Sequence, residues 1–245
     1  MRRLLIALQF LTVIPLYKHL QVNEEDLGKS ALYFPVVGLF IGGCLIGSNV
    51  CLSFFLPRSV VDGILILVLI LITGSIHLDA LADTVDGVAC GKEKNEKLSI
   101  MKDGNVGAMG VVAVFLVLVL KYLALAALPE YSKHQSLLLM PVLGRWSQVG
   151  VAYLSDYAGL KKGLGFPITR YVTHRIVIVT TMVSLLVAVY LFRQKGFIMT
   201  ALVALFCLLY SRFFKRALGG VTGDVLGAAN EITEVAVLMM ILVRF

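Results

Sequence analysis

The sequence has little charge. Asp, Glu, Lys and Arg together make up 15% of its 245 residues, whereas soluble globular domains carry about 25%. Hydrophobic residues make up 59%, and the mean hydropathy is +0.90. This balance excludes an ordinary soluble domain and indicates an integral membrane protein.

Cysteine is also scarce. Cys44, Cys51, Cys90 and Cys207 form no CxxC motif, and we interpret them as small hydrophobic residues. The chain has no evident internal repeat, and no hydrophilic stretch is longer than the one from Thr84 to Asn105. We therefore expect residues 1–245 to form a single membrane domain without a soluble appendage.

Long apolar stretches recur along the chain. A helix needs roughly 20 residues to cross a hydrocarbon layer of about 30 Å. The pattern predicts an all-α, polytopic membrane bundle of about seven transmembrane helices. They cover Ala31–Leu56, Val61–Ala82, Val106–Leu128, Gln135–Leu154, His174–Phe192, Phe197–Ser211 and Asp224–Val243. The N-terminal segment "MRRLLIALQFLTVIPL" lacks a small-residue cleavage site and is predicted to be an interfacial or re-entrant helix.

Basic residues are distributed unevenly between the loops. With seven spans and a cytoplasmic N-terminus, fifteen Lys and Arg residues fall on the cytoplasmic side and five on the other. This bias fixes the orientation by the positive-inside rule. The net charge of +7 is thereby explained by topology, and we expect no nucleic-acid binding.

Three aspartates follow one of the apolar stretches, in "GSIHLDALADTVDG" from Gly74 to Gly87. On a helix Asp79, Asp83 and Asp86 share one face, where they repel one another and pay for desolvation. A hard divalent cation, Mg²⁺ or Mn²⁺, resolves such a cluster and also binds substrate phosphates. The alternatives are an acidic helix end that faces water and a set of protonated carboxyls in a proton path.

Polar residues on both sides of this run are further candidates for the site. His77 either contacts substrate or bonds a backbone carbonyl. In "LSIMKDGNVGAMG", Asp103 can add a fourth carboxylate, Lys102 can meet a phosphate, and Asn105 can contact substrate. The alternative is a hydrated loop followed by a helix with Asn105 as its N-cap.

Charged residues also occur inside the predicted spans. Arg145 needs a partner there, either a substrate phosphate or an acid of another helix. Asp224, Glu231 and Glu234 share one helical face; among them Asp224 is favoured for substrate binding because it lies near the cytoplasmic face. For Lys121 we expect a structural partner.

The predicted topology collects acids and cations on one side of the membrane. Lys161, Lys162 and the cluster from Arg212 to Arg216 lie on the same side as the aspartates. The acids would hold a metal ion, and the metal and cations would hold a polyphosphate. This arrangement is typical of phosphoryl or phospho-alcohol transfer.

Five motifs carry a resemblance to a known family. They are "LQFLTVIPL", "HLDALADTVDG", "MKDGNVGAMG", "LGRW" and "GGVTGDVLGAANEITE", in this order along nearly the whole chain. Together they resemble the cobalamin-5′-phosphate synthases, also called adenosylcobinamide-GDP ribazoletransferases.

The resemblance implies an enzyme of the prokaryotic cytoplasmic membrane that requires Mg²⁺. Its members join adenosylcobinamide-GDP to α-ribazole or α-ribazole 5′-phosphate and release GMP. Carried over by motif, Asp79, Asp83, Asp86 and Asp103 would form the metal and phosphate site. Neither the resemblance nor the sequence identifies the general base, and a homo-oligomer is left open.

Three alternative functions are weaker. The CDP-alcohol phosphotransferase pattern D-x2-D-G-x2-A-R matches at Asp83, Asp86 and Gly87, but Cys90 and Gly91 replace its Ala-Arg pair. A membrane prenyltransferase would carry a second DxxxD motif, which the C-terminal acids do not form. A cation-coupled transporter would show internal pseudo-symmetry and polar groups on both sides of the midplane, and the sequence shows neither.

Overall fold

The computed structural model describes residues 1–15, 22–158 and 163–243. Within these residues the regular structure is helical, apart from one isolated bridge between Tyr157 and Val221, so the all-α prediction is confirmed. The helices are α1 (Arg2–Leu11), α2 (Glu24–Ser30), η1 (Ala31–Tyr33), α3 (Phe34–Ser53), α4 (Arg58–Thr73), α5 (Ile76–Cys90), α6 (Lys94–Ile100), α7 (Ala108–Ala127), α8 (Glu130–Tyr153), α9 (Gly165–Tyr171), α10 (His174–Phe192), α11 (Gln194–Leu218) and α12 (Gly223–Leu242).

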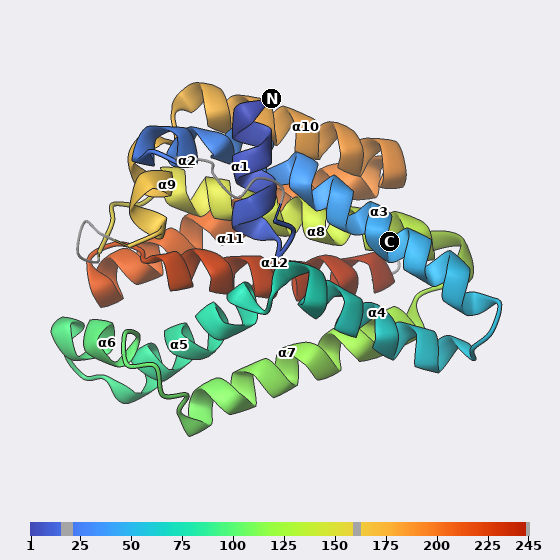
Figure 1. Cartoon of the computed structure of the whole chain (residues 1–245), viewed down its shortest axis with the longest axis horizontal. Coiled ribbons are helices and arrows are strands. Elements are labelled where there is room, and N and C mark those ends of the chain that lie inside the picture. Colours follow the sequence, from blue (N-terminus) through green and yellow to red (C-terminus); the bar gives the residue numbers. More distant parts are fainter. Residues whose placement is uncertain (16–21, 159–162, 244–245) are drawn as a thin grey trace.

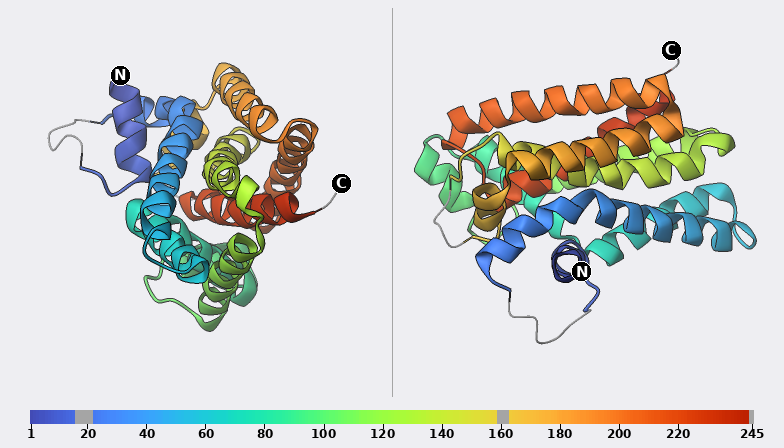
Figure 2. Two further views of the ribbon diagram at one scale, coloured as in Figure 1. Left: turned by 90° about the vertical axis from the view of Figure 1, so that its right-hand side faces the viewer. Right: turned by 90° about the horizontal axis from the view of Figure 1, so that it is seen from above.

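The long helices lie side by side along the longest axis of the molecule, and α1 crosses them (Figures 1 and 2). Helix α8 packs against α3, α10, α11 and α12, and most of its residues are buried. Small residues permit the closest of these contacts. A Cβ atom at Gly38 or Gly42 of α3 would lie 2.6 Å and 2.8 Å, respectively, from backbone atoms of α8.

Most of the predicted spans correspond to single helices. Among the described residues, five helical segments are long and apolar enough to cross a membrane, and a sixth crossing results if α4 and α5 form one broken span. The remaining prediction, Gln135–Leu154, falls on α8. This helix has 24 residues, but charged and polar side chains such as Lys133, Arg145 and Gln148 make it less apolar, and other helices surround it.

The prediction of one continuous helix over Val61–Ala82 is wrong. Helix α4 ends at Thr73, α5 begins at Ile76, and the two are bent by 88°. Gly74 and Ser75 between them both adopt left-handed backbone conformations, with φ of 61° and 60°. Glycine adopts this conformation freely, whereas serine is strained by it. The break gives the aspartates a short helix of their own.

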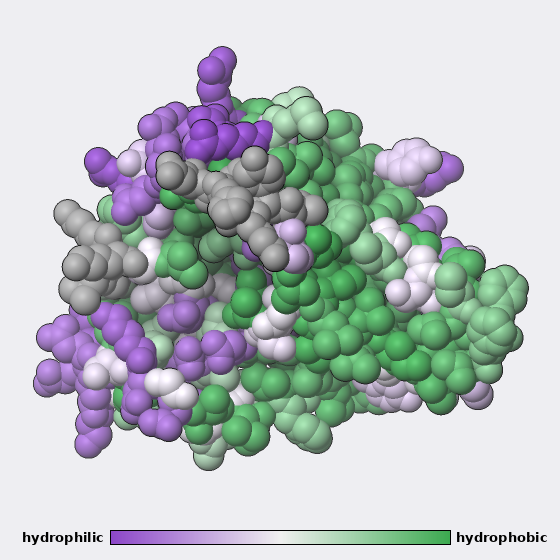
Figure 3. All heavy atoms as spheres, viewed as in Figure 1, coloured by the Kyte–Doolittle hydropathy of each residue, from purple (hydrophilic) through white to green (hydrophobic). Residues whose placement is uncertain are grey.

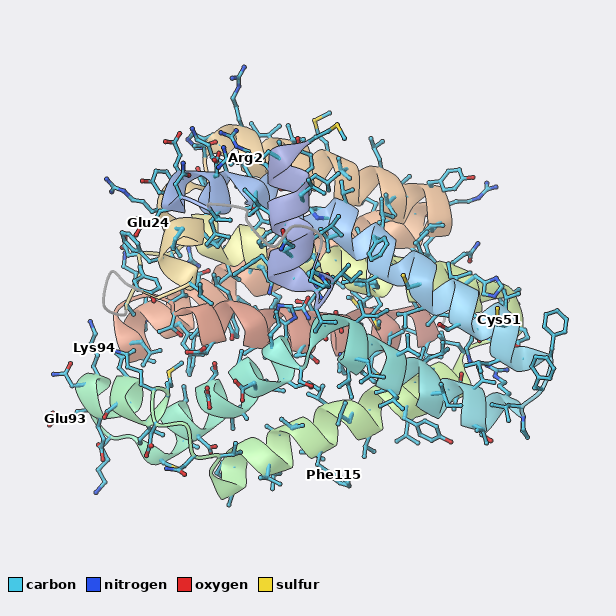
Figure 4. The ribbon with its side chains drawn as sticks, in the orientation of Figure 1. Arg2, Glu24, Cys51, Glu93, Lys94 and Phe115 are labelled. Atoms are coloured by element: carbon cyan, nitrogen blue, oxygen red, sulfur yellow. The ribbon has the colours of Figure 1, made fainter. Side chains whose placement is uncertain are left out.

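Polar residues gather at one end of the bundle. Hydrophilic side chains cover the end that contains α2, α6 and the C-terminus of α5, and apolar side chains cover much of the rest of the visible face (Figure 3). Glu24, Glu93 and Lys94 lie at this polar end, and Cys51 lies at the opposite end (Figure 4). The predicted phosphate contacts Lys161 and Lys162 lie outside the described residues.

The N-terminal segment forms the separate ten-residue helix α1. Its side chains Ile6, Ala7 and Leu11 are buried against the bundle. Just after it, the Val13 backbone N–H donates a 2.9 Å hydrogen bond to the Ile72 carbonyl at the end of α4. Helix α1 therefore packs beside the bend that precedes the aspartates.

Candidate active site

The three aspartates of α5 occupy one helix, as predicted. Asp79 is exposed, Asp83 is half-buried and Asp86 is buried. The negative charges that act on Asp83 are those of Asp79, Asp224 and Asp86. Helix α12 packs against α5, so the fold brings Asp224, from the other end of the sequence, within electrostatic range of Asp79 and Asp83.

A short turn delivers Asp224 to this position. The Val221 N–H donates a 2.8 Å hydrogen bond to the Asp156 carbonyl, and the Ala158 N–H donates a 2.9 Å bond to the Val221 carbonyl. Thr222 then caps α12 by accepting from the Val225 N–H, and its hydroxyl donates to the Asp224 carboxylate at 3.3 Å. Asp224 lies in the first turn of α12, where the helix dipole stabilises a negative charge.

Tyr157 lies beside this turn and was not identified from the sequence. Burial raises the pKa of its phenol, and the charge of Asp224 raises that pKa further. Its ring packs edge-on against Phe166, with 5.5 Å between the ring centroids. The phenol therefore remains neutral and available as a hydrogen-bond donor next to Asp224.

Helices α5 and α12 approach closely at the site. A Cβ atom at Gly227 of α12 would lie 2.5 Å from the Ala80 Cβ and 3.3 Å from the ring of His77. His77 is 5% exposed. Its Nδ1 has no hydrogen-bond partner among the residues that the structure describes, so the expected alternative of a bond to a backbone carbonyl is not observed for this atom.

Asp86 has a role that the sequence interpretation did not include. Its Oδ2 accepts a 2.7 Å hydrogen bond from the Gly107 N–H, and its Oδ1 accepts a 2.8 Å bond from the Gly110 N–H. The side chain is therefore an N-terminal cap of α7, supplied by α5. Each oxygen keeps a further acceptor site beside these bonds, so the cap adds a structural role to Asp86, and its role as a metal ligand stays a prediction.

The loop before α7 carries the other predicted site residues. Lys102, Asp103 and Asn105 are all exposed, and the Asn105 amide donates a 3.0 Å hydrogen bond to Asp103. Among the described residues, Asp103 belongs to no group of three acidic, His or Cys side chains that could hold a metal ion. The alternative role of Asn105 as the N-cap of α7 is wrong, because Gly107 occupies that position.

A buried ionic network crosses the bundle next to the site. Lys121 of α7 donates to Glu231 at 2.7 Å and to Glu234 at 2.5 Å, which confirms its expected structural partner. Arg145 of α8, which has no exposed surface, donates to Glu234 at 3.0 Å and to Asn230. Of the two partners considered for Arg145, the structure contains the acid of another helix.

A cavity of about 350 Å³ opens beside Asp224. Asp224 and His77 both line it, together with Gln148 of α8 and apolar residues of α1, α3, α9 and α12. Sequence reasoning found only the first two, because the others are unremarkable members of apolar helices. The arrangement is an acidic group next to a mostly apolar pocket at one end of a helical bundle.

Comparison with known proteins decides the family. The sequence model of the cobalamin-5-phosphate synthases matches residues 3–242. The chain belongs to this family. Cobalamin-5-phosphate synthases are transferases, so the protein is an enzyme of cobalamin biosynthesis with membrane-spanning helices.

Curated relatives of this synthase cover almost its whole length. A protein of Geotalea daltonii is 39% identical over 98% of this chain and 96% of its own. Proteins of Thermoanaerobacter pseudethanolicus and Clostridium acetobutylicum are 33% and 34% identical, with similar coverage. All three relatives are named adenosylcobinamide-GDP ribazoletransferase. No solved structure matches the chain.

Membership of the synthase family sets aside the prenyltransferase, CDP-alcohol phosphotransferase and transporter alternatives.

The resemblance also implies a magnesium ion, and the oxygen donors of the site have the chemistry that this ion requires. In the part of the chain that the structure describes, no Lys or Arg forms an ion pair with Asp79, Asp83 or Asp224. These hard oxygen donors are the ligand type that Mg²⁺ prefers.

The same carboxylates do not form a complete protein cage. Among the described residues, no three His, Cys, Asp or Glu side chains lie close enough together to hold an ion by themselves. Mg²⁺ is commonly bound by one or two carboxylates together with substrate phosphates and water. One or two of the carboxylates of Asp79, Asp83 and Asp224 fit that mode of binding, in which substrate phosphates and water supply the remaining ligands.

Proposed function

We propose that the enzyme transfers the cobinamide phosphate of adenosylcobinamide-GDP to the 3′-hydroxyl of α-ribazole or α-ribazole 5′-phosphate. GMP is released, and adenosylcobalamin or its 5′-phosphate is formed. The names of the relatives support the choice of substrates. The observation that carries the proposal is the group of Asp79, Asp83 and Asp224, three carboxylates from two helices that form no ion pair with a basic residue of the described segments.

The reaction breaks one phosphoanhydride bond and forms one phosphate ester bond. The 3′-oxygen of the acceptor forms a bond to the phosphorus that stays with cobinamide, and the bond from that phosphorus to the oxygen of GMP breaks. The hydroxyl proton passes to a carboxylate of the acidic group. Mg²⁺, when bound, neutralises negative charge on the diphosphate and on the leaving GMP.

One or two carboxylates of the group Asp79, Asp83 and Asp224 would hold that ion together with the substrate diphosphate. Without the ion and the bound substrate diphosphate, the three carboxylates repel one another. Helix α5 fixes the first two on successive turns, and the cap of α12 fixes the third. The enzyme thus presents a prearranged negative site that only a cation can bridge to an anionic substrate.

The loop of Lys102, Asp103 and Asn105 would contact the phosphates. Asp86 ties the end of this loop to α5 through Gly107. The exposed Lys102 then supplies a positive charge, and Asp103 and Asn105 supply hydrogen-bonding groups. Arg145 has no place in this set of contacts, because its guanidinium is buried against Glu234.

We place the enzyme in the prokaryotic cytoplasmic membrane with the acidic group facing the cytoplasm. The fifteen-to-five distribution of Lys and Arg over the predicted loops supports this orientation. Lys215 and Arg216, in the last turn of α11, belong to the larger set. Water-soluble substrates would then reach the site without crossing the bilayer.

Purified enzyme in detergent tests the proposal with adenosylcobinamide-GDP and α-ribazole 5′-phosphate as substrates. We expect GMP and a new corrinoid product in equal amounts with Mg²⁺, and neither product when EDTA removes the metal. A CDP-alcohol and an isoprenyl diphosphate serve as negative controls. Absence of GMP from folded, Mg²⁺-supplied enzyme, or turnover of a control substrate, would refute the proposal.

A further inference from the structure

The residues that line the cavity beside Asp224 are suited to binding a flat, apolar ring. Phe10 of α1 and Phe34 of α3 both line it, with their rings stacked at 6.1 Å between centroids and 23° between planes. Ile168 of α9 and Leu226 of α12 also contribute to the lining. Aromatic and apolar side chains of this kind bind an aromatic ring by burying its apolar surface and by offset stacking.

Two buried polar atoms in the same cavity have no hydrogen-bond partner within the described segments of the chain. The Nδ1 of His77 and the Oε1 of Gln148 make no hydrogen bond, although these residues are 5% and 4% exposed. A buried polar atom without a partner is destabilising, and most such atoms in folded proteins are paired. Both residues line the cavity, so a ligand in the cavity would be able to satisfy them.

The volume of the cavity and the polarity of its lining indicate which part of the two substrates it can hold. A cavity of about 350 Å³ is near the lower end of the range for small-molecule pockets, which excludes the corrin macrocycle. Guanine carries several donors and acceptors around its edge, and the mostly apolar walls would leave many of these unpaired. A dimethylbenzimidazole ring is flat and apolar and has one free ring nitrogen.

We infer that this cavity binds the benzimidazole base of the acceptor ribonucleoside, an assignment that rests on the proposed function. His77 donates from Nδ1 to the free ring nitrogen, and Gln148 accepts from a sugar hydroxyl. Asp224 lies in the same lining and in the acidic group. The sugar of a base held in the cavity therefore emerges beside the carboxylates, where its 3′-hydroxyl must react.

Steady-state kinetics of four variants test this assignment. Phe10→Ala removes part of the aromatic wall, Gln148→Leu removes the acceptor, and His77→Asn removes the imidazole. We expect each to raise the KM for α-ribazole 5′-phosphate about tenfold and to leave the KM for adenosylcobinamide-GDP within about twofold. His134→Asn is the matched control, since His134 is exposed and bonds Asn49 outside the cavity.

Other kinetic outcomes overturn the assignment. A selective rise in the KM for adenosylcobinamide-GDP would place the guanine base in the cavity. Unchanged constants for both substrates in folded variants would show that the cavity binds neither base.

Photolabelling of the wild-type enzyme tests the same assignment without depending on the folding of any variant. An azido derivative of the ribonucleoside should label peptides of α1, α5 or α12 in competition with α-ribazole. Labelling elsewhere, together with normal GMP release, would refute the cavity assignment alone. Labelling in the cavity of an enzyme that releases no GMP would refute the proposed function and leave the cavity assignment intact.

Discussion

The carboxylate of Asp86 holds the N-terminus of α7, where its Oδ2 accepts a 2.7 Å hydrogen bond from the Gly107 N–H. We predict that Asp86→Ala lowers stability as well as activity, because it removes two buried charge-assisted bonds worth about 1.5–3 kcal/mol each. Thermal unfolding in detergent measures the first effect. Asp83→Asn is the comparison, because it removes repulsion and should not lower the Tm.

An unchanged Tm for Asp86→Ala would contradict this role. It would return Asp86 to the function first expected from its spacing, that of a ligand beside Asp79 and Asp83. The comparison therefore separates a cap from a metal ligand on the same helix.

The contact between α5 and α12 at Gly227 predicts a second effect. Gly227→Ala would place a Cβ atom 2.5 Å from the Ala80 Cβ, so the helices must separate at a cost of about 1–3 kcal/mol. Gly47→Ala in α3 is the control, since nothing lies within 4 Å of its Cβ position. Alanine there should leave stability unchanged or raise it by about 0.5–1 kcal/mol. Equal Tm values for the two variants would argue against close packing at the site.

The buried network makes Lys121 a structural residue. Lys121→Met leaves Glu231 and Glu234 without their shared cation, and breaking a buried pair in this way costs about 3–5 kcal/mol. We expect a large fall in Tm or in the yield of folded protein. Adding Glu231→Gln to Lys121→Met should recover part of the loss. A double variant no more stable than the single one would show that the two groups are not coupled.

The bend at Gly74 and Ser75 predicts opposite effects at neighbouring positions. Gly74→Ala puts a side chain in a left-handed conformation and against Val13, so we expect a loss of about 1–2 kcal/mol. Ser75→Gly relieves the same strain and should preserve or raise the Tm. If α4 and α5 formed one straight helix, Gly74→Ala would raise the Tm and Ser75→Gly would lower it, because glycine is the poorer helix former.

Much of the fold follows from the sequence, because long apolar stretches require helices in a bilayer. The break in the second stretch does not, since Gly74 and Ser75 are also tolerated inside transmembrane helices. The spacing of Asp79 and Asp83 was sufficient to place them on one helix face. The partner of Asp86 was not predictable, because its two backbone donors come from a loop that tertiary packing brings to α5.

The site was only partly visible in the sequence for a similar reason. Asp224 was recognised as a polar residue near the right membrane face, but only the packing of α12 on α5 joins it to Asp83. Gln148 and Phe10 carried no signal, because a single amide or phenylalanine is common in apolar helices. Their place in a cavity depends on the packing of six helices, α1, α3, α5, α8, α9 and α12.

Asp224→Asn tests the central claim most directly, because only the fold brings this residue to the α5 carboxylates. The measurement is the rate of Mg²⁺-dependent GMP release from adenosylcobinamide-GDP and α-ribazole 5′-phosphate, with Glu24→Gln as an exposed carboxylate-to-amide control at the same end of the molecule. We predict a fall of at least about 100-fold at unchanged Tm, the scale for loss of a charge-stabilising group, and a control within about twofold of wild type. A rate for Asp224→Asn within about threefold of wild type at every Mg²⁺ concentration would contradict the claim that Asp79, Asp83 and Asp224 form one site.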